Sequence, residues 1–368
     1  MKTKALRVLA MLSLPALGVI AEQTATAEDD QPTIQKDWVQ FTPYTVAKYH
    51  GDFNTWSWVP RMLLRVNGPI PSGSQLFVEV NAPGGGPWVK FDCQTGQTEK
   101  GHWHKTECGG HDVPEDKGTL TTGMVHFAIK MRNELTGAPE LTLFTGQVKV
   151  DKAHSNEHGP KAANEWVYFA DQDWNLPIGY LFYTADDVKK WDLPEFHVAF
   201  WLRGPVGTFE PHLMHNGAEV GKRSFNGNEV GRAICDPEIT NETTHYVEDS
   251  IPQRATWTRL KCGFPNVRGW DKTGQAPGPL GAPFTFKDNP GDYEFKLLWN
   301  NHLARSIKFS VNAEGKFHNG IAEANKLGDD RTIVPVQVLG DQDGTWDHNA
   351  WRTAAFNGNP LTGFTAPQ

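Results

Sequence analysis

Residues 123–130 read Gly-Met-Val-His-Phe-Ala-Ile-Lys, so apolar side chains recur at every second position, at Val125, Phe127 and Ile129. Alternate side chains of an extended chain point to opposite faces of a sheet, and this spacing predicts a strand with one buried face. Similar runs lie at 62–66, 75–80 and 141–144, separated by turn residues such as Gly68-Pro69. Short strands between Gly/Pro turns are typical of an antiparallel β-sandwich.

The C-terminal half of the sequence repeats this strand and its neighbours. The pattern Gly123-x-Val-x-Phe-x-Ile129 matches Gly291-x-Tyr-x-Phe-x-Leu297, and an Asn and a Leu follow each at the same spacing. The other matching segments are Trp58-Val-Pro60 and Gly68-Pro69 with Trp191-Asp-Leu-Pro194 and Gly204-Pro205, and Val167–Asp173 with Val336–Asp343. Because the order is kept, we predict an all-β fold of two tandem, duplicated antiparallel β-sandwich domains, immunoglobulin-like or jelly-roll-like.

The first residues predict a signal peptide. Lys2, Lys4 and Arg7 precede an apolar run over 8–20, and Ala25-Thr-Ala27 offers a small-residue cleavage site. This pattern indicates export to the periplasm or the cell exterior, with cleavage after Ala27 or, as second choice, after Ala21. We therefore divide the chain into a signal peptide (1–27), a linker (28–35), repeat 1 (36–180), repeat 2 (181–350, with a short helix over 321–327) and a C-terminal tail (351–368).

Charge and hydropathy limit the classes of partner. The formal net charge is -8, and acidic and basic residues are interspersed without a basic stripe, which argues against nucleic acid. After the signal peptide no run approaches the roughly 18 apolar residues of a transmembrane helix. We therefore expect a soluble exported protein whose partner is an extracellular glycan or an envelope protein.

Four cysteines in an exported chain predict two disulfides. Cys93 and Cys108 lie in the first predicted repeat, and Cys235 and Cys262 lie in the second. One bridge within each repeat is the simplest of the three possible pairings. Each would stabilise the fold by about 3 kcal/mol in the chain-entropy account.

An Asp-Gln-Asp sequence occurs in both predicted repeats, each time after a strand. The first copy supplies Asp171 and Asp173, and the second supplies Asp341, Asp343 and the nearby Asp347. Alternate carboxylates in a loop suit Ca²⁺, which prefers oxygen ligands, so calcium is the one cofactor that the sequence proposes. The alternative is a turn in which Asp accepts hydrogen bonds from its own backbone. The motif is identical in the two copies although the flanking positions differ.

A histidine cluster is a second candidate metal site. His102 and His104 lie on one face of a predicted strand, and His111 follows Cys108. Neutral imidazoles suit Zn²⁺ or Cu²⁺, whereas the alternative is a solvated loop. The second repeat has no equivalent cluster.

The chain contains 14 Trp residues, which is unusual for its length. Trp201 and Trp299 lie within strand patterns and are predicted core residues. Four other tryptophans lie in turns, where flat rings could receive the apolar face of a sugar: Trp88, Trp103, Trp270 and Trp346. The alternative is that these rings cover the ends of the sandwich cores.

No serine-hydrolase, zinc-protease or phosphate-loop motif is present. We therefore expect an exported, non-enzymatic binding or structural module that contacts a glycan, a protein or an envelope component. The alternative is a secreted polysaccharide-active enzyme that uses the histidine cluster or a carboxylate pair such as Glu210 and Asp236.

Overall fold

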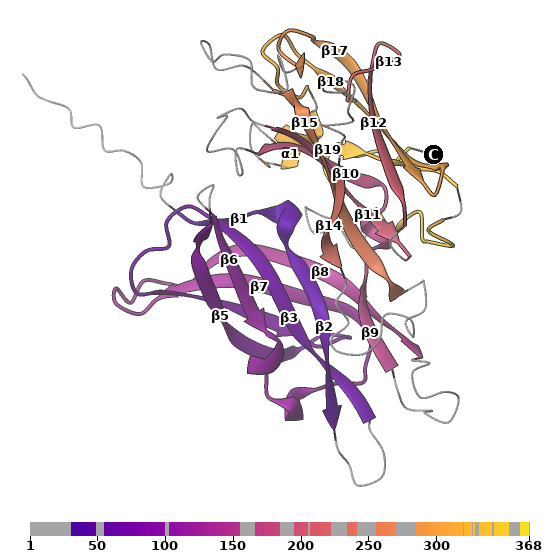
Figure 1. The fold of residues 1–368 in the computed structure, drawn as a ribbon. Helices are drawn as coiled ribbons and strands as arrows, with labels where there is room; N and C mark the ends of the chain where they lie inside the picture. Colours follow the sequence, from indigo (N-terminus) through magenta and orange to yellow (C-terminus); the bar gives the residue numbers. More distant parts are fainter. Residues whose placement is uncertain are drawn as a thin grey trace, which may run out of the picture.

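A computed structural model gives the arrangement of the strands (Figure 1). It describes residues 31–48, 55–99, 103–154, 166–184, 195–204, 207–221, 234–240, 255–269, 284–318, 320–325, 327, 331–340, 342–352 and 361–367. The predicted signal peptide and the first three residues of the predicted linker, 28–30, lie outside these ranges. Within them strands make up most of the structure and nearly all pair antiparallel, so the all-β prediction is confirmed.

The N-terminal half forms one nine-stranded sheet that curls into a half-barrel. Its strands are β1 (Thr33–Ile34), β2 (Gln40–Lys48), β3 (Thr55–Asn67), β4 (Ser74–Asn81), β5 (Pro87–Glu99), β6 (Trp103–Gly109), β7 (Gly123–Asn133), β8 (Leu141–His154) and β9 (Trp166–Asp171). As predicted, Val125, Phe127 and Ile129 of β7 are buried, and His126 between them is exposed.

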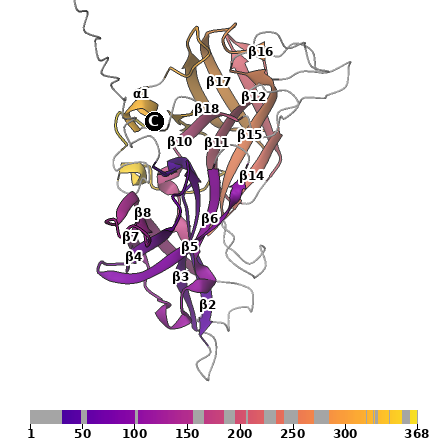
Figure 2. The same cartoon turned by 90° about the vertical axis from the view of Figure 1, so that its left-hand side faces the viewer.

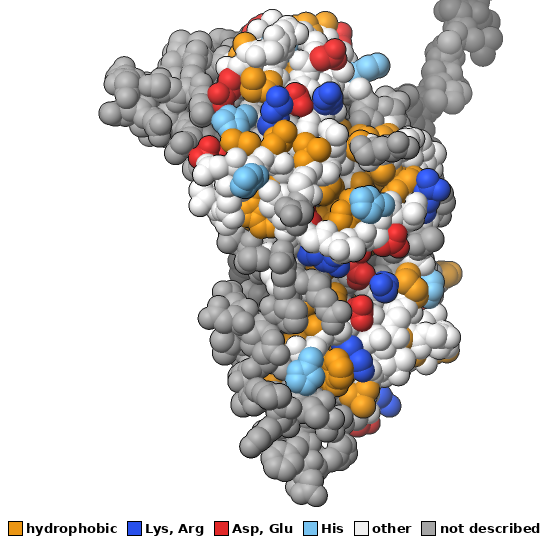
Figure 3. All heavy atoms as spheres, turned by 90° about the vertical axis from the view of Figure 1, so that its right-hand side faces the viewer, with side chains coloured by type: hydrophobic (Ala, Val, Ile, Leu, Met, Phe, Trp, Pro, Cys, Tyr) orange, Lys and Arg blue, Asp and Glu red, His pale blue; other side chains and the backbone are white. Residues whose placement is uncertain are grey.

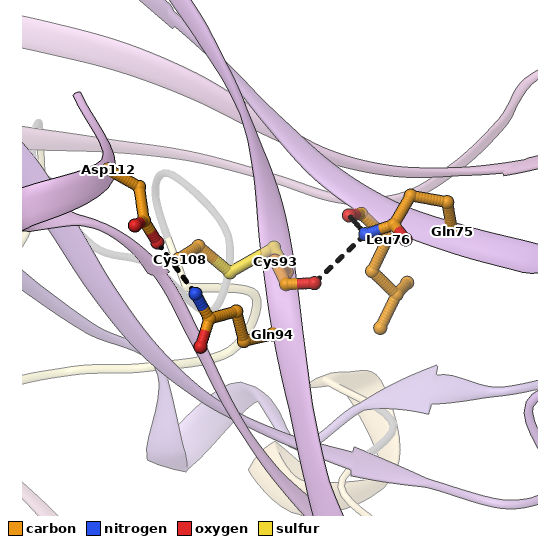
Figure 4. Close-up of a disulfide and its surroundings, with 6 residues drawn as sticks. All are labelled: Gln75, Leu76, Cys93, Gln94, Cys108 and Asp112. Carbon is orange, nitrogen blue, oxygen red and sulfur yellow. Dashed lines mark hydrogen bonds between the residues drawn. A yellow bond between two sulfur atoms is a disulfide. The ribbon is translucent and has the colours of Figure 1, made fainter. Parts of the chain in front are cut away.

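Strand β5 produces the curl because it pairs with two different partners. Its first part pairs with β4 up to Asp92, and from Cys93 onward it pairs with β6. Where β5 leaves β4, the Gln75 amide donates to the carbonyl oxygens of Cys93 and Leu76, at 2.9 Å each (Figure 4). The side chain thus supplies a hydrogen bond at the point where the β4 backbone no longer pairs with β5.

The C-terminal half consists of a six-stranded and a five-stranded sheet. Its elements are β10 (Ile178–Thr184), β11 (Glu195–Arg203), β12 (Phe209–His215), β13 (Ala218–Glu219), β14 (Ile234–Thr240), β15 (Trp257–Arg268), β16 (Phe284–Thr285), β17 (Gly291–Trp299), β18 (His302–Val311), α1 (Gly320–Asn325), β19 (Arg331–Pro335) and β20 (Gln337–Val338). The short predicted helix is present as α1. Strand β10 crosses the predicted repeat boundary at residue 180 and pairs with β11 and β19.

The two halves share the same order of strand pairing. The order β2-β3-β6-β5 in the first half corresponds to β10-β11-β15-β14 in the second. The order β5-β4-β7-β8-β9 corresponds to β13-β12-β17-β18-β20. Gly123 and Gly291, which begin β7 and β17, both have a φ of 136°. Duplication of the sequence itself stays a prediction.

Both disulfides form within the predicted repeats, as expected. Cys93 lies directly opposite Cys108 on β5 and β6, and Cys235 lies directly opposite Cys262 on β14 and β15. Each bridge therefore joins two strands that already pair. Among the described residues, no helix is long and apolar enough to cross a membrane.

The six-stranded sheet packs against apolar residues on both of its faces. This packing joins the N-terminal half to the C-terminal half. Leu181 and Val198 point into the core of the second half, whereas Tyr180 and Phe182 belong to the core cluster of the first half. A third, smaller apolar cluster contains Trp38, Trp201 and other residues from both halves. Figures 1 and 2 show the strands from β10 onward stacked above the strands up to β9.

Candidate functional sites

The two Asp-Gln-Asp turns meet across Arg203, at the end of β11. The Arg203 guanidinium lies 3.1 Å from Oδ1 of Asp173, in the first turn. The Arg203 backbone N–H donates to Oδ1 of Asp343, in the second turn, at 2.8 Å, and its side chain donates to the Thr345 carbonyl. The backbone N–H of Asp347 also donates to Asp173, at 2.8 Å. Residues more than 170 positions apart in the sequence therefore form one polar junction between the halves.

Asp343 is the most deeply buried carboxylate of this junction. Both terminal guanidinium nitrogens of Arg305, on β18, lie 2.7 Å from its two oxygens. The Arg305 side chain is fully buried and also donates to the carbonyls of Trp201 and Ala304, at 3.2 and 2.8 Å. Burial of this ion pair is tolerable because each charge has an opposite charge in contact and additional hydrogen bonds.

The first copy forms the turn that the sequence offered as the alternative to calcium. The Asp173 N–H donates to Oδ1 of Asp171 at 2.9 Å, which is the Asx-turn hydrogen bond. Oδ2 of Asp171 lies 3.2 Å from the Lys149 ammonium. Burial and then the neighbouring charge of Asp171 raise the pKa of Asp173 to about 6.

These contacts bear on the calcium prediction. Asp171, Asp173 and Asp343 each contact a cationic side chain, so an ion would have to displace Lys149, Arg203 or Arg305. The exposed Asp347 accepts the N–H of Asn349, and Asp341 lies outside the described residues. The described part of the chain contains no group of three His, Cys, Asp or Glu side chains placed to hold a metal ion. The geometry favours the turn alternative, while calcium binding itself stays a prediction.

A second charged network crosses the same interface, and sequence reasoning missed it. Asp37, whose side chain has no solvent exposure, accepts hydrogen bonds from Arg259 at 3.3 Å and from Arg331 at 2.5 Å. Arg259 also donates to Glu238 at 2.7 Å, and Arg65 from the first half lies 3.7 Å from the same carboxylate. The N-terminal residues after the predicted linker are thereby tied to β15 and β19. No local motif marks these residues, because the contacts join five separate segments.

His197 lies beside this network on β11. Its ring stacks on Phe182 at 5.4 Å and is 8 % exposed. Burial, followed by the nearby charge of Lys261, lowers the pKa of His197 to about 3. The imidazole is therefore neutral at physiological pH, and its ring packs on Phe182.

The histidine cluster is not assembled by the described residues. His104 lies opposite Val66, near the start of β6, whereas His111 follows the other end of that strand. The His111 ring lies edge-on to Tyr44 and hydrogen-bonds the Tyr44 hydroxyl at 2.8 Å. His102 lies outside the described residues.

The four tryptophans whose rings are predicted to receive a sugar have different surroundings. Trp88 is partly buried, lies edge-on to Trp58 at 5.0 Å and donates to the Lys117 carbonyl at 2.9 Å. Trp346 is partly buried and stacks on His348 at 3.9 Å. The side chain of Trp103 and the whole of Trp270 lie outside the described residues. The predicted core residues Trp201 and Trp299 are buried, which confirms that assignment.

A groove of about 460 Å³ lies on the five-stranded sheet. Its lining comes from β12, β17, β18 and the β12–β13 turn: Met214, Asn216, Gly217, Asp292, Tyr293, Glu294, Lys296, Lys308, Phe309 and Ser310. Figure 3 views the side on which Figure 1 places β12 and β13, and there basic, acidic, histidine and hydrophobic side chains are intermixed over the C-terminal half. Sequence reasoning missed this groove, although the alternation along β17 predicts which side chains face away from the core.

The carboxylates proposed for an enzyme lie on different sheets. Glu210 lies on β12 of the five-stranded sheet, opposite Leu298, and Asp236 lies on β14 of the six-stranded sheet, opposite Lys261. Comparisons with protein-family models, with curated proteins and with solved structures each find no match.

Proposed function

We propose that this chain is an exported, non-enzymatic binding module whose ligand is a glycan of the extracellular or envelope space. The observation that carries the proposal is the groove on the five-stranded sheet, which offers hydrogen-bond donors and acceptors beside a thioether. Such a combination suits a sugar, which presents hydroxyl groups around an apolar C–H face.

The support beneath the groove favours a binding role. The sheet that carries the groove packs on an apolar core, and the second sheet of that half is fixed to the N-terminal half by two charged networks. A rigid support reduces the ordering cost of binding. Two disulfides between paired strands support an exported location, because such bonds persist in oxidising compartments.

Affinity electrophoresis of the processed protein through gels that contain soluble polysaccharides tests the proposal. We expect at least one polysaccharide to retard the protein without being depolymerised. Retardation by none of a panel of neutral, acidic and amino-sugar polymers would contradict the proposal. Release of reducing ends from a retarding polymer would instead support the enzyme alternative.

A further inference from the structure

The two disulfides differ in their access to solvent. In the N-terminal half, Cys93 is 5 % exposed and Cys108 is fully buried. In the C-terminal half Cys262 is also fully buried, but Cys235 is only partly buried. Thiol–disulfide exchange requires a thiolate to reach one of the two sulfur atoms. Cys235 is therefore the cysteine at which an external thiolate can most readily attack.

The strands that carry the two bridges also differ in their support. Strand β6 pairs with β3 and β5, and β5 pairs with β4 as well as with β6. The Gln75 amide holds the Cys93 carbonyl in addition (Figure 4). Strand β14, in contrast, lies at the edge of the six-stranded sheet, and β15 is its one pairing partner among the strands that the structure describes. Loss of the Cys235–Cys262 bridge therefore affects the less supported strand.

The pairing of β14 with β15 is itself interrupted. The register shifts between Pro237 and Ile239, so the ladder is divided into two short parts. Proline has no N–H group to donate to a ladder. The bridge at Cys235 reinforces the first of these parts, which is the part that leads into the shift.

Glu238 lies within this register shift and connects β14 to the junction between the halves. Its carboxylate accepts a hydrogen bond from Arg259 of β15 at 2.7 Å and lies 3.7 Å from Arg65 of β3. Arg259 is 1 % exposed, so this contact belongs to the buried charged network. The position of β14 therefore determines whether Glu238 can neutralise these two arginines.

We propose that the Cys235–Cys262 bridge is a redox switch, which an external dithiol opens in the folded protein to loosen β14 and its contact with the N-terminal half. A thiolate of the dithiol attacks Sγ of Cys235, the bond to Cys262 breaks, and the Cys262 thiolate takes up a proton. The second thiol of the dithiol then attacks the mixed disulfide, which leaves the dithiol oxidised and Cys235 as a thiol. The bridge between Cys93 and Cys108 stays closed.

Reduction of the folded, processed protein by dithiothreitol, followed by alkylation with iodoacetamide and peptide mapping, tests the selectivity. We expect Cys235 and Cys262 to become alkylated roughly tenfold or more faster than Cys93 and Cys108, because the rate of exchange depends on access. In a denaturing concentration of urea the two bridges should react at similar rates. Equal rates in the folded protein, faster opening of Cys93–Cys108, or a difference that persists in urea would each overturn the proposal.

Hydrogen exchange read by mass spectrometry tests the consequence of opening. In the double variant Cys235→Ser with Cys262→Ser, amides of residues 234–240 should exchange roughly tenfold or more faster than in the wild type, because local opening of β14 becomes easier. The matched control is Cys93→Ser with Cys108→Ser, which should leave exchange over 234–240 unchanged. The same measurement on wild-type protein held in dithiothreitol applies if the first variant does not fold. Unchanged protection of 234–240 after opening of the bridge would overturn the switch.

Discussion

The two faces of the six-stranded sheet differ in chemistry, although both are buried. The face toward the C-terminal core carries apolar residues such as Leu181, Val198 and Leu260. The face toward the N-terminal half carries Arg203, Arg259 and other charged groups among its aromatic residues. Apolar packing is nearly non-directional, whereas a buried charge is stable only against a correctly placed partner. We infer that the charged face fixes one orientation of the two halves.

The largest expected effect tests the buried ion pair on β18 that lies next to the charged face. Arg305→Met removes one partner of a buried pair and leaves the Asp343 carboxylate without its principal cation, which should lower the free energy of unfolding by about 3–5 kcal/mol. Urea denaturation measures the loss. The matched control is Arg132→Met, because Arg132 pairs at 3.1 Å with Asp92 at the surface. The control should cost less than about 1 kcal/mol, and equal losses would contradict the distinction.

Tryptophan substitutions compare the interface with the apolar core. Trp299, in the core of the second half, and Trp201, in the cluster shared by the halves, are 3 % and 4 % exposed. Alanine at either position should cost about 3–5 kcal/mol. Trp346→Ala should cost less, about 1–2 kcal/mol, because the ring is only partly buried. The substitutions are compared by urea denaturation, and a loss for Trp346→Ala equal to that for Trp299→Ala would place this ring in a core role.

The sequence predicted the apolar face of the six-stranded sheet much better than its charged face. Alternating apolar residues specify strands and their buried sides, so β7, β17 and the core positions Trp201 and Trp299 could be assigned. The cysteine pairs followed from their positions. The charged face could not be predicted, because Asp37, Arg259 and Arg331 belong to segments that meet only in the folded chain. The first Asp-Gln-Asp forms the turn that the sequence offered as the alternative to a calcium site, but the sequence does not show that Asp173 and Asp343 meet at Arg203.

The pH dependence of the unfolding free energy is a finer test of the charged face. His197 has a pKa of about 3 in the fold and about 6.5 when unfolded, so its contribution to stability is present above pH 6.5 and is lost as the pH falls toward 3. Asp173 acts in the opposite direction, because its raised pKa makes the folded state take up a proton first between about pH 6 and 4.

The His197→Phe variant isolates the histidine contribution. Between pH 7 and pH 5 the wild type should lose about 2 kcal/mol more unfolding free energy than the variant, from a linkage of about 1.4 kcal/mol per pH unit. Urea denaturation at the two pH values gives the comparison. Identical losses in the two proteins would show that His197 takes up its proton in the folded state.

The smallest expected effect concerns calcium. Because Lys149, Arg203 and Arg305 already contact the carboxylates of the Asp-Gln-Asp turns, millimolar Ca²⁺ should leave the melting temperature unchanged. Asp343→Ala should lower that temperature equally with calcium and with chelator. A rise with added calcium that this substitution abolishes would instead establish the turns as an ion site, because a ligand of the native state stabilises it.

Differential scanning calorimetry tests most directly the claim that the charged face makes the two halves one unit. The wild type should unfold in a single transition whose calorimetric and van't Hoff enthalpies agree. The double variant Arg203→Met with Arg259→Met should separate this into two transitions, one for each half. Two transitions in the wild type, or one cooperative transition in the double variant, would contradict the account.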